Sequence, residues 1–110
     1  MVNSSSPFGG RARTEVLLAL RLLDQSYPRE LARVLERPLS GVQGALRGLE
    51  RDGLIAGQSV GRTRLFRLNP RYFARDELQH YLLKLTDADD ALRAKVTQLR
   101  RRPRRTGKPL

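Results

Sequence analysis

Arginine side chains are the main chemical groups that this 110-residue chain offers to a partner, since only three of its 22 basic residues are lysines and its net charge is +11. Residues 59–75 contain no acid, and five arginines occur among them: Arg62, Arg64, Arg67, Arg71 and Arg75. A guanidinium group presents a planar pair of N–H donors that matches phosphate oxygens. This stretch therefore predicts a polyanionic partner, and nucleic acid is the first candidate.

A second group of polar side chains, within residues 38–52, is spaced for the recognition of bases. On a helix turning about 100° per residue, the apolar side chains share one face: Val42, Ala45, Leu46 and Leu49. Polar side chains lie largely opposite: Ser40, Gln43, Arg47 and Arg51. Glutamine can pair with adenine and arginine with guanine. An isolated exposed arginine is more often only a solvated charge, so the clustering carries the prediction. The predicted DNA contacts are Arg29, Ser40, Gln43, Arg47, Arg51, Arg62, Thr63 and Arg64.

An arm and a first helix are expected before these residues. Residues 1–10 are rich in serine and glycine, which predicts a flexible N-terminal arm with order beginning near Arg11. Apolar residues then recur with helical spacing, and Thr14 is the expected cap of a helix that ends near Gln25.

Two prolines and a glycine delimit the next two helices. Pro28 suits the first position of a helix of about eight residues. The dipeptide Arg37-Pro38 ends that helix, because a proline disfavours a helical conformation in the residue before it. A third helix is predicted over residues 38–52, with Gly53 as its left-handed cap.

A β-hairpin is predicted after the third helix, with its tip, or wing, over about residues 58–66. Phe66 and Leu68 alternate with Arg67, so one side of the second strand can pack while the other stays in water. Helix, turn, helix and basic hairpin in this order predict a winged helix-turn-helix fold, mainly α with a small β-hairpin. In such a fold the third helix enters the major groove and the wing lies on the flanking backbone.

Three glycines at helical spacing, Gly41, Gly44 and Gly48, form a stripe along the third predicted helix. Each glycine inside a helix costs about 1 kcal/mol relative to alanine, so something is expected to approach the stripe closely. Two explanations stay open, namely tight packing against a neighbouring helix and close approach of a DNA backbone.

The C-terminal third has an apolar pattern with a heptad-like spacing that Asp89 interrupts. The chain there is either one long helix with a polar break or two helices, with Thr86-Asp87 capping the second; the pattern favours a break near Thr86. With a neighbouring tyrosine, the pattern predicts a dimer interface: Leu78, Tyr81, Leu82, Leu85, Leu92, Val96 and Leu99. Residues 100–110 carry six basic and no acidic side chains, and a disordered tail that adds non-specific DNA affinity is expected.

The composition argues against several other classes of function. There is no cysteine, and His80 is the only histidine, so no metal or cofactor is expected. No glycine-rich phosphate loop and no pairing of a nucleophile with a base is present, which argues against an enzyme. Neither a signal peptide nor a membrane-spanning run is expected, so the simplest location is the cytoplasm, associated with the nucleoid.

Three segments resemble the ArsR-type winged helix-turn-helix transcriptional regulators: LARVL at 31–35, SGVQGALRGLERDGLI at 40–55 and GRTRLFRL at 61–68. The sequence FGGRAR at 8–13 more weakly resembles the start of winged-helix proteins associated with nucleotidyltransferases. The main resemblance implies a dimer joined by its terminal helices. It also implies the branch without metal sensing, because the metal-sensing branch carries cysteines in the helix that corresponds to residues 28–36.

Together these features predict a DNA-binding domain over residues 11–70, a helical dimerisation region over 71–99 and the basic tail. The leading hypothesis is a dimeric, sequence-specific repressor that binds double-stranded DNA; no effector can be named from the sequence. The alternatives are a winged-helix module that binds another protein, and a non-specific or architectural DNA-binding protein. RNA binding is disfavoured because few aromatic residues are available for base stacking.

Overall fold

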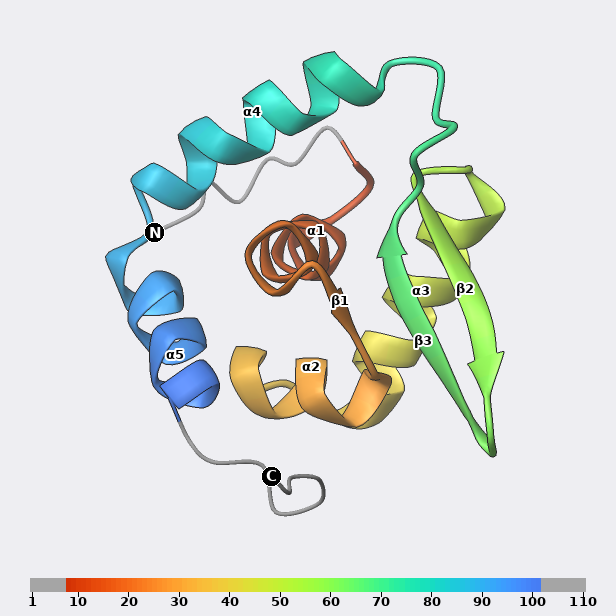
Figure 1. Cartoon of the computed structure of the whole chain (residues 1–110), viewed down its shortest axis with the longest axis horizontal. Helices are drawn as coiled ribbons and strands as arrows, with labels where there is room; N and C mark the ends of the chain where they lie inside the picture. Colours follow the sequence, from red (N-terminus) through yellow and green to blue (C-terminus); the bar gives the residue numbers. More distant parts are fainter. Residues whose placement is uncertain (1–7, 102–110) are drawn as a thin grey trace.

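Glycine, proline and left-handed residues set the limits of the first three helices in the computed structural model, which describes residues 8–101 (Figure 1). Helix α1 spans Arg11–Leu23, α2 spans Pro28–Leu35 and α3 spans Leu39–Arg51. The second and third helices are confirmed as predicted, and Gly53 is left-handed, with φ 86°. Residues 1–7 of the expected arm and 102–110 of the expected tail lie outside the described residues.

The predicted start of the first helix at Thr14 is wrong. Gly10 precedes the helix with φ 148°, and Thr14 is buried one turn inside it, where its hydroxyl donates to the Gly10 carbonyl at 3.3 Å. Before this helix, the Phe8 ring packs edge-on against Tyr81 with centroids 5.7 Å apart. The helix ends at Asp24, which has φ 77°.

Three antiparallel strands form the sheet, in the order β1-β3-β2. Strands β2, Ile55–Val60, and β3, Thr63–Leu68, confirm the hairpin, and the second strand ends at Leu68 as predicted. The predicted wing, about residues 58–66, is the outer part of this hairpin, and Gly61 has φ 63° at the turn. Strand β1, Gln25–Ser26, was not predicted, because two residues carry no strand pattern of their own. It exists through its pairing with β3, in which Ser26 lies opposite Phe66.

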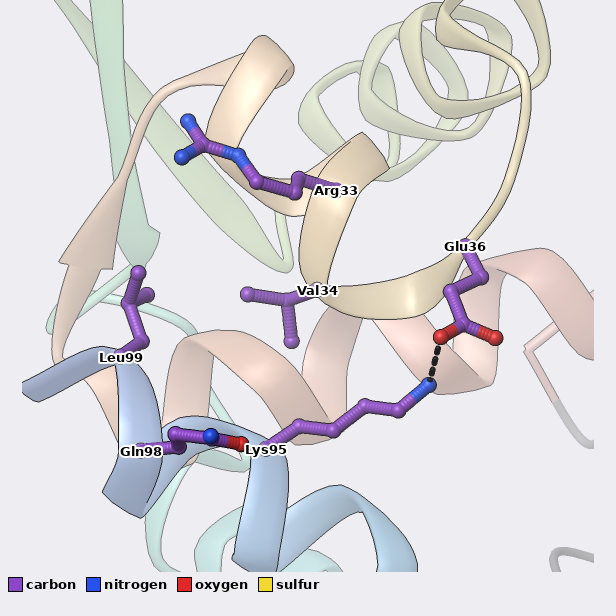
Figure 2. A pocket seen from close by; sticks show the side chains of 6 residues that line it. All are labelled: Arg33, Val34, Glu36, Lys95, Gln98 and Leu99. Carbon is purple, nitrogen blue, oxygen red and sulfur yellow. Dashed lines mark ion pairs between the residues drawn. The ribbon is translucent and has the colours of Figure 1, made fainter.

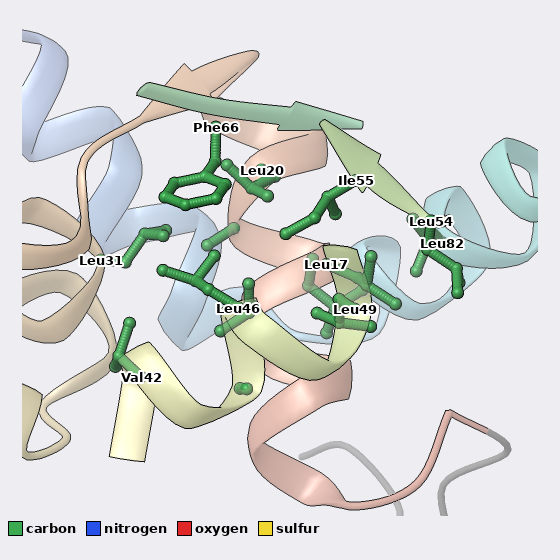
Figure 3. Packing of buried hydrophobic residues seen from close by; sticks show 14 of the residues in the cluster. Leu17, Leu20, Leu31, Val42, Leu46, Leu49, Leu54, Ile55, Phe66 and Leu82 are labelled. Carbon is green, nitrogen blue, oxygen red and sulfur yellow. The ribbon is translucent and has the colours of Figure 1, made fainter. Parts of the chain in front are cut away.

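Helix α1 lies at the centre of the molecule, and the other elements surround it (Figure 1). Five consecutive residues of α1, from Val16 to Leu20, are buried, which places apolar side chains on all of its sides. Figure 3 shows Leu17 and Leu20 of α1 among Leu46 and Leu49 of α3 and Phe66 of β3. This core fixes α3 and the hairpin relative to one another.

Two C-terminal helices complete the core: α4, Arg75–Asp87, and α5, Asp90–Arg101. The favoured break near Thr86 is confirmed, but Thr86 does not cap the second helix. Its hydroxyl donates to the Leu83 carbonyl at 2.9 Å, and the carboxylate of Asp89 accepts from the Leu92 N–H at 3.1 Å. Asp89, the residue that interrupts the apolar pattern, is therefore the cap of α5.

Polar contacts join α5 and α1 to the helix-turn-helix. Lys95 of α5 pairs with Glu36 at the end of α2 at 2.6 Å, beside a cavity of about 420 Å³ that Val34 and Leu99 also line (Figure 2). Arg37, in the turn between α2 and α3, donates to Glu15 of α1 at 2.8 Å. That hydrogen bond raises the pKa of Arg37 above its ordinary value.

Candidate nucleic-acid interface

Helix α3 has one buried and one exposed face, as its pattern predicts. Val42, Leu46 and Leu49 are in the core. The four polar side chains predicted to contact DNA are all exposed: Ser40, Gln43, Arg47 and Arg51. The core therefore holds the helix by its apolar side and leaves the polar side available to a partner.

A groove of about 360 Å³ runs between α3 and the hairpin, and we call it the α3–wing groove. Five of the eight predicted DNA contacts line it: Gln43, Arg47, Arg62, Thr63 and Arg64. Arg29 is exposed on α2 beside Pro28, which lines the groove, whereas Ser40 and Arg51 lie elsewhere on α3. The fold thus brings together side chains separated by about 20 residues of sequence.

The arginines of this surface differ in their partners. Arg64 donates to both carboxylate oxygens of Glu50 on α3, at 3.1 and 3.0 Å, and its guanidinium lies 5.2 Å from the centroid of the Phe66 ring. Arg51 lies 3.8 Å from Asp52. Arg47 and Arg62 form no ion pair within residues 8–101, so their charges are the most available to an anion.

Glu50 also lines the candidate site, although the sequence analysis did not single it out. It lines the α3–wing groove with Gln43 and Arg47, and the three residues follow the i, i+4, i+7 spacing of one helix face. That spacing was the available signal. The carboxylate holds the wing against α3 and also places a negative charge among the groove's arginines.

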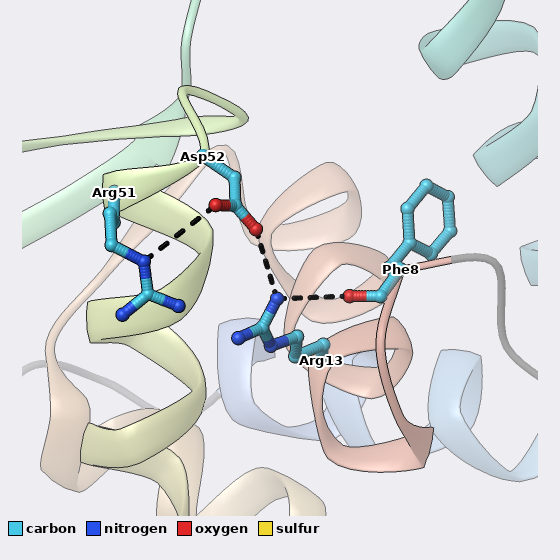
Figure 4. A network of polar contacts seen from close by, with 4 residues as sticks. All are labelled: Phe8, Arg13, Arg51 and Asp52. Atoms are coloured by element: carbon cyan, nitrogen blue, oxygen red, sulfur yellow. Dashed lines mark hydrogen bonds and ion pairs between the residues drawn. The ribbon is translucent and has the colours of Figure 1, made fainter.

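The glycine stripe on α3 divides into two parts. A Cβ atom at Gly48 would overlap the guanidinium of Arg13 from α1, which donates to the Phe8 carbonyl at 3.2 Å and to Asp52 at 3.1 Å (Figure 4). Packing against a neighbouring helix therefore explains Gly48. A Cβ atom at Gly41 would meet nothing within 4 Å, so close approach of DNA remains a prediction for that end of the stripe.

The predicted dimer contacts on α4 and α5 are largely inside the single chain. Four of the seven side chains belong to its core: Leu78, Leu82, Leu92 and Val96. Leu85 and Leu99 are partly buried against that core, and Tyr81 is 41% exposed. Leu83, 43% exposed, and Phe73, 91% exposed, are large apolar side chains that the sequence analysis did not single out.

No group of three metal-ligating side chains occurs within residues 8–101, and His80 is exposed on α4. Over the same residues, no helix has the length and apolar character needed to cross a membrane.

Known structures share this fold, although no protein-family model and no curated protein sequence matches the chain. Reduced HlyU from Vibrio cholerae is 23% identical over 74% of this chain and 79% of its own, with a TM-score of 0.58. A cysteine-to-serine mutant of Lactococcus lactis ZitR, solved in complex with DNA, is 20% identical over 82% of this chain and 65% of its own, with a TM-score of 0.55. AdcR, the adhesin competence repressor of Streptococcus pyogenes, is 20% identical over 74% of this chain and 63% of its own, with a TM-score of 0.51.

These likenesses show a shared architecture. The chain has a winged helix-turn-helix fold with two further C-terminal helices, which confirms the predicted fold class. It spans about two thirds of the length of ZitR and AdcR. Within this fold, α2 and α3 are the helix-turn-helix, and β2 with β3 is the wing.

Proposed function

We propose that this protein is a sequence-specific transcriptional regulator that binds double-stranded DNA. The observation that carries the proposal is the α3–wing groove, where Gln43 and Arg47 on one helix face lie beside Arg62 and Thr63 of the wing. A helix of this width fits the major groove, where glutamine and arginine side chains can distinguish base pairs. The wing arginines then bind phosphates on the flanking backbone, independently of sequence.

The structural neighbours support DNA as the partner and repression as the outcome. The ZitR structure contains DNA, and AdcR is by its name a repressor. A regulator whose α3 occupies promoter DNA represses by blocking access to it. We propose that the protein is an ArsR-type regulator because its segments 31–35, 40–55 and 61–68 resemble that family. Within the family we propose the branch without metal sensing, since the chain has no cysteine to serve as a thiolate ligand.

We further propose that the regulator acts as a homodimer through the outer surfaces of α4 and α5. The candidate contacts are the predicted interface residues that are not fully buried in the chain's own core, together with the exposed Leu83. They are Tyr81, Leu83, Leu85 and Leu99. Two copies related by a two-fold axis would place one α3 in each half of a pseudo-palindromic site.

Selection of bound fragments from genomic DNA tests this function directly. The expected result is an enriched palindromic motif, and Arg47→Ala should lower affinity for that motif by about 1–3 kcal/mol more than affinity for random DNA. Arg33→Ala is the matched control, because Arg33 is exposed on α2 and does not line the α3–wing groove. It lines the cavity beside Val34 and Leu99 instead. Equal losses on the motif and on random DNA would show non-specific or architectural binding, and no DNA binding at all would favour a protein-binding module.

A further inference from the structure

A second basic cavity, of about 240 Å³, is lined by residues where α1 ends and β1 begins, and it is separate from the α3–wing groove. We call it the Arg21 cavity. Its walls come from the end of α1, β1, the end of β3 and the start of α4. Its polar lining includes three arginines, two glutamines and one acid: Arg21, Arg67, Arg75, Gln25, Gln79 and Asp24. None of these residues lines the α3–wing groove.

Arg21, which lines this cavity, has a buried donor without a hydrogen-bond partner. Its Nε atom is the one buried side-chain nitrogen or oxygen within residues 8–101 that has no hydrogen-bond partner. A buried donor attached to a charged group is costly to leave unpaired. Because Arg21 also lines the cavity, an anion bound there can satisfy this donor once the side chain turns toward it. The sequence alone gives no sign of this, because Arg21 occupies an ordinary position in the last turn of α1.

Arg67 and Arg75 bring two more guanidinium groups to the same cavity. Arg67 follows the buried Phe66 on β3, and alternation along the strand points it to the side of the sheet opposite α3. Arg75 donates to the Pro70 carbonyl at 3.3 Å and pairs with Asp76 at 3.4 Å, which leaves its Nη2 without a partner among the described residues. Asp24 also lines the cavity but forms no ion pair with Arg21, Arg67 or Arg75.

We propose that the Arg21 cavity binds a phosphate group. Guanidinium groups arranged around one volume match the several acceptor oxygens of phosphate, and the amides of Gln25 and Gln79 add neutral donors. The phosphate joins α1, β3 and α4, so it fixes the base of the wing from the face opposite the DNA-binding groove. It comes either from a small phosphorylated molecule or from the backbone of a DNA duplex that extends past the wing.

Titration with inorganic phosphate, at constant ionic strength maintained with chloride, tests the site in the full-length protein. Amide NMR shifts around Gln25 and Gln79 should saturate with phosphate, and Arg21→Met should weaken binding on the order of tenfold. Arg67→Gln provides a second variant at an exposed position that cannot unfold the protein by cavity formation, and a loss of similar size is expected. Arg33→Met removes the same charge from an exposed position of α2 that does not line the Arg21 cavity, and this variant should bind phosphate as the wild type does.

Two results would overturn the site: shifts that rise without saturation, and equal affinities in all four proteins. Either one would show general attraction of phosphate to a basic protein. Since this titration contains no DNA, its failure leaves the proposed DNA-binding function intact, and a failure of DNA binding leaves the phosphate site intact.

DNA binding in chloride buffer identifies the source of the phosphate. If the duplex supplies it, Arg21→Met and Arg67→Gln weaken binding to every sequence alike, and the slope of log affinity against log salt becomes shallower by about one. If a small molecule supplies it, DNA affinity in chloride is unchanged, whereas the phosphate titration still separates the variants. Both results support the site, and they assign it to different ligands.

Discussion

The polar face of α3 and the apolar stripe of α4 and α5 were inferred from the same kind of helical periodicity. In the folded chain, only the first of them is an exposed surface. The face of α3 lies on the surface beside the wing, whereas Leu78, Leu82, Leu92 and Val96 are buried in the chain's own core. Periodicity identifies which side of a helix avoids water. It does not say whether the same chain or a second copy covers that side.

The largest expected effect comes from breaking the stripe at Leu82, which is fully buried. Leu82→Ala should lower the free energy of unfolding by about 2–5 kcal/mol, because it removes buried contacts and leaves a cavity. Lys84→Ala, at an exposed position of α4 outside the proposed dimer contacts, should change stability by less than about 0.5 kcal/mol and is the control. Urea unfolding measures both. A dimer that dissociates in Leu82→Ala with its stability unchanged would mean that the stripe faces a partner.

The break between α4 and α5 gives the next largest effect. Asp89→Ala removes the side chain that accepts from the Leu92 N–H and should cost about 1 kcal/mol. Thr86→Val keeps the shape of the side chain and removes a hydroxyl that does not cap α5. It should lower the free energy of unfolding by less than Asp89→Ala does. Thermal unfolding measures the stability of both variants. A larger loss of stability in Thr86→Val than in Asp89→Ala would mean that Thr86 is the cap of α5.

A pair of glycine substitutions compares the two ends of α3. Gly41→Ala should stabilise the protein by up to about 1 kcal/mol, because alanine favours the helix and the added Cβ atom meets nothing within 4 Å. Gly48→Ala should gain less, since it displaces Arg13 from the Phe8 carbonyl and from Asp52. In an Arg13→Ala background the two substitutions should become equal. Equal gains in the wild-type background would contradict the role of Arg13.

The smallest change in stability is expected at Glu50. Its ion pair with Arg64 is partly exposed, so Glu50→Gln should alter stability by less than about 1 kcal/mol. DNA affinity should rise, because Arg64 becomes available to phosphate. The slope of log affinity against log salt should become steeper by about one. Glu77→Gln removes the same charge from the exposed surface of α4 and serves as the control. Identical gains in both variants would show only the effect of net charge.

Much of the fold could be predicted because local signals limit its elements. Pro28, Pro38 and Gly53 mark the ends of α2 and α3, and alternation around Phe66 marks the hairpin. Strand β1 could not be predicted in this way, since two residues become a strand only when β3 lies beside them.

The candidate site was predictable to a similar degree. Helical spacing identified Gln43 and Arg47, and the same spacing includes Glu50. The partner of Glu50 could not be predicted, because Arg64 belongs to another element and reaches it only once the core has set the angle between α3 and the wing. The unpaired Nε of Arg21 likewise depends on elements that meet only in the folded chain.

The contact between Arg13 and Gly48 has a consequence for the evolution of this chain. Arg13 reaches Asp52 and the Phe8 carbonyl by lying where any side chain at position 48 would begin. Substitution at either position therefore changes which residues are acceptable at the other. Among descendants of this sequence, a side chain larger than alanine should become acceptable at position 48 only after Arg13 has been replaced.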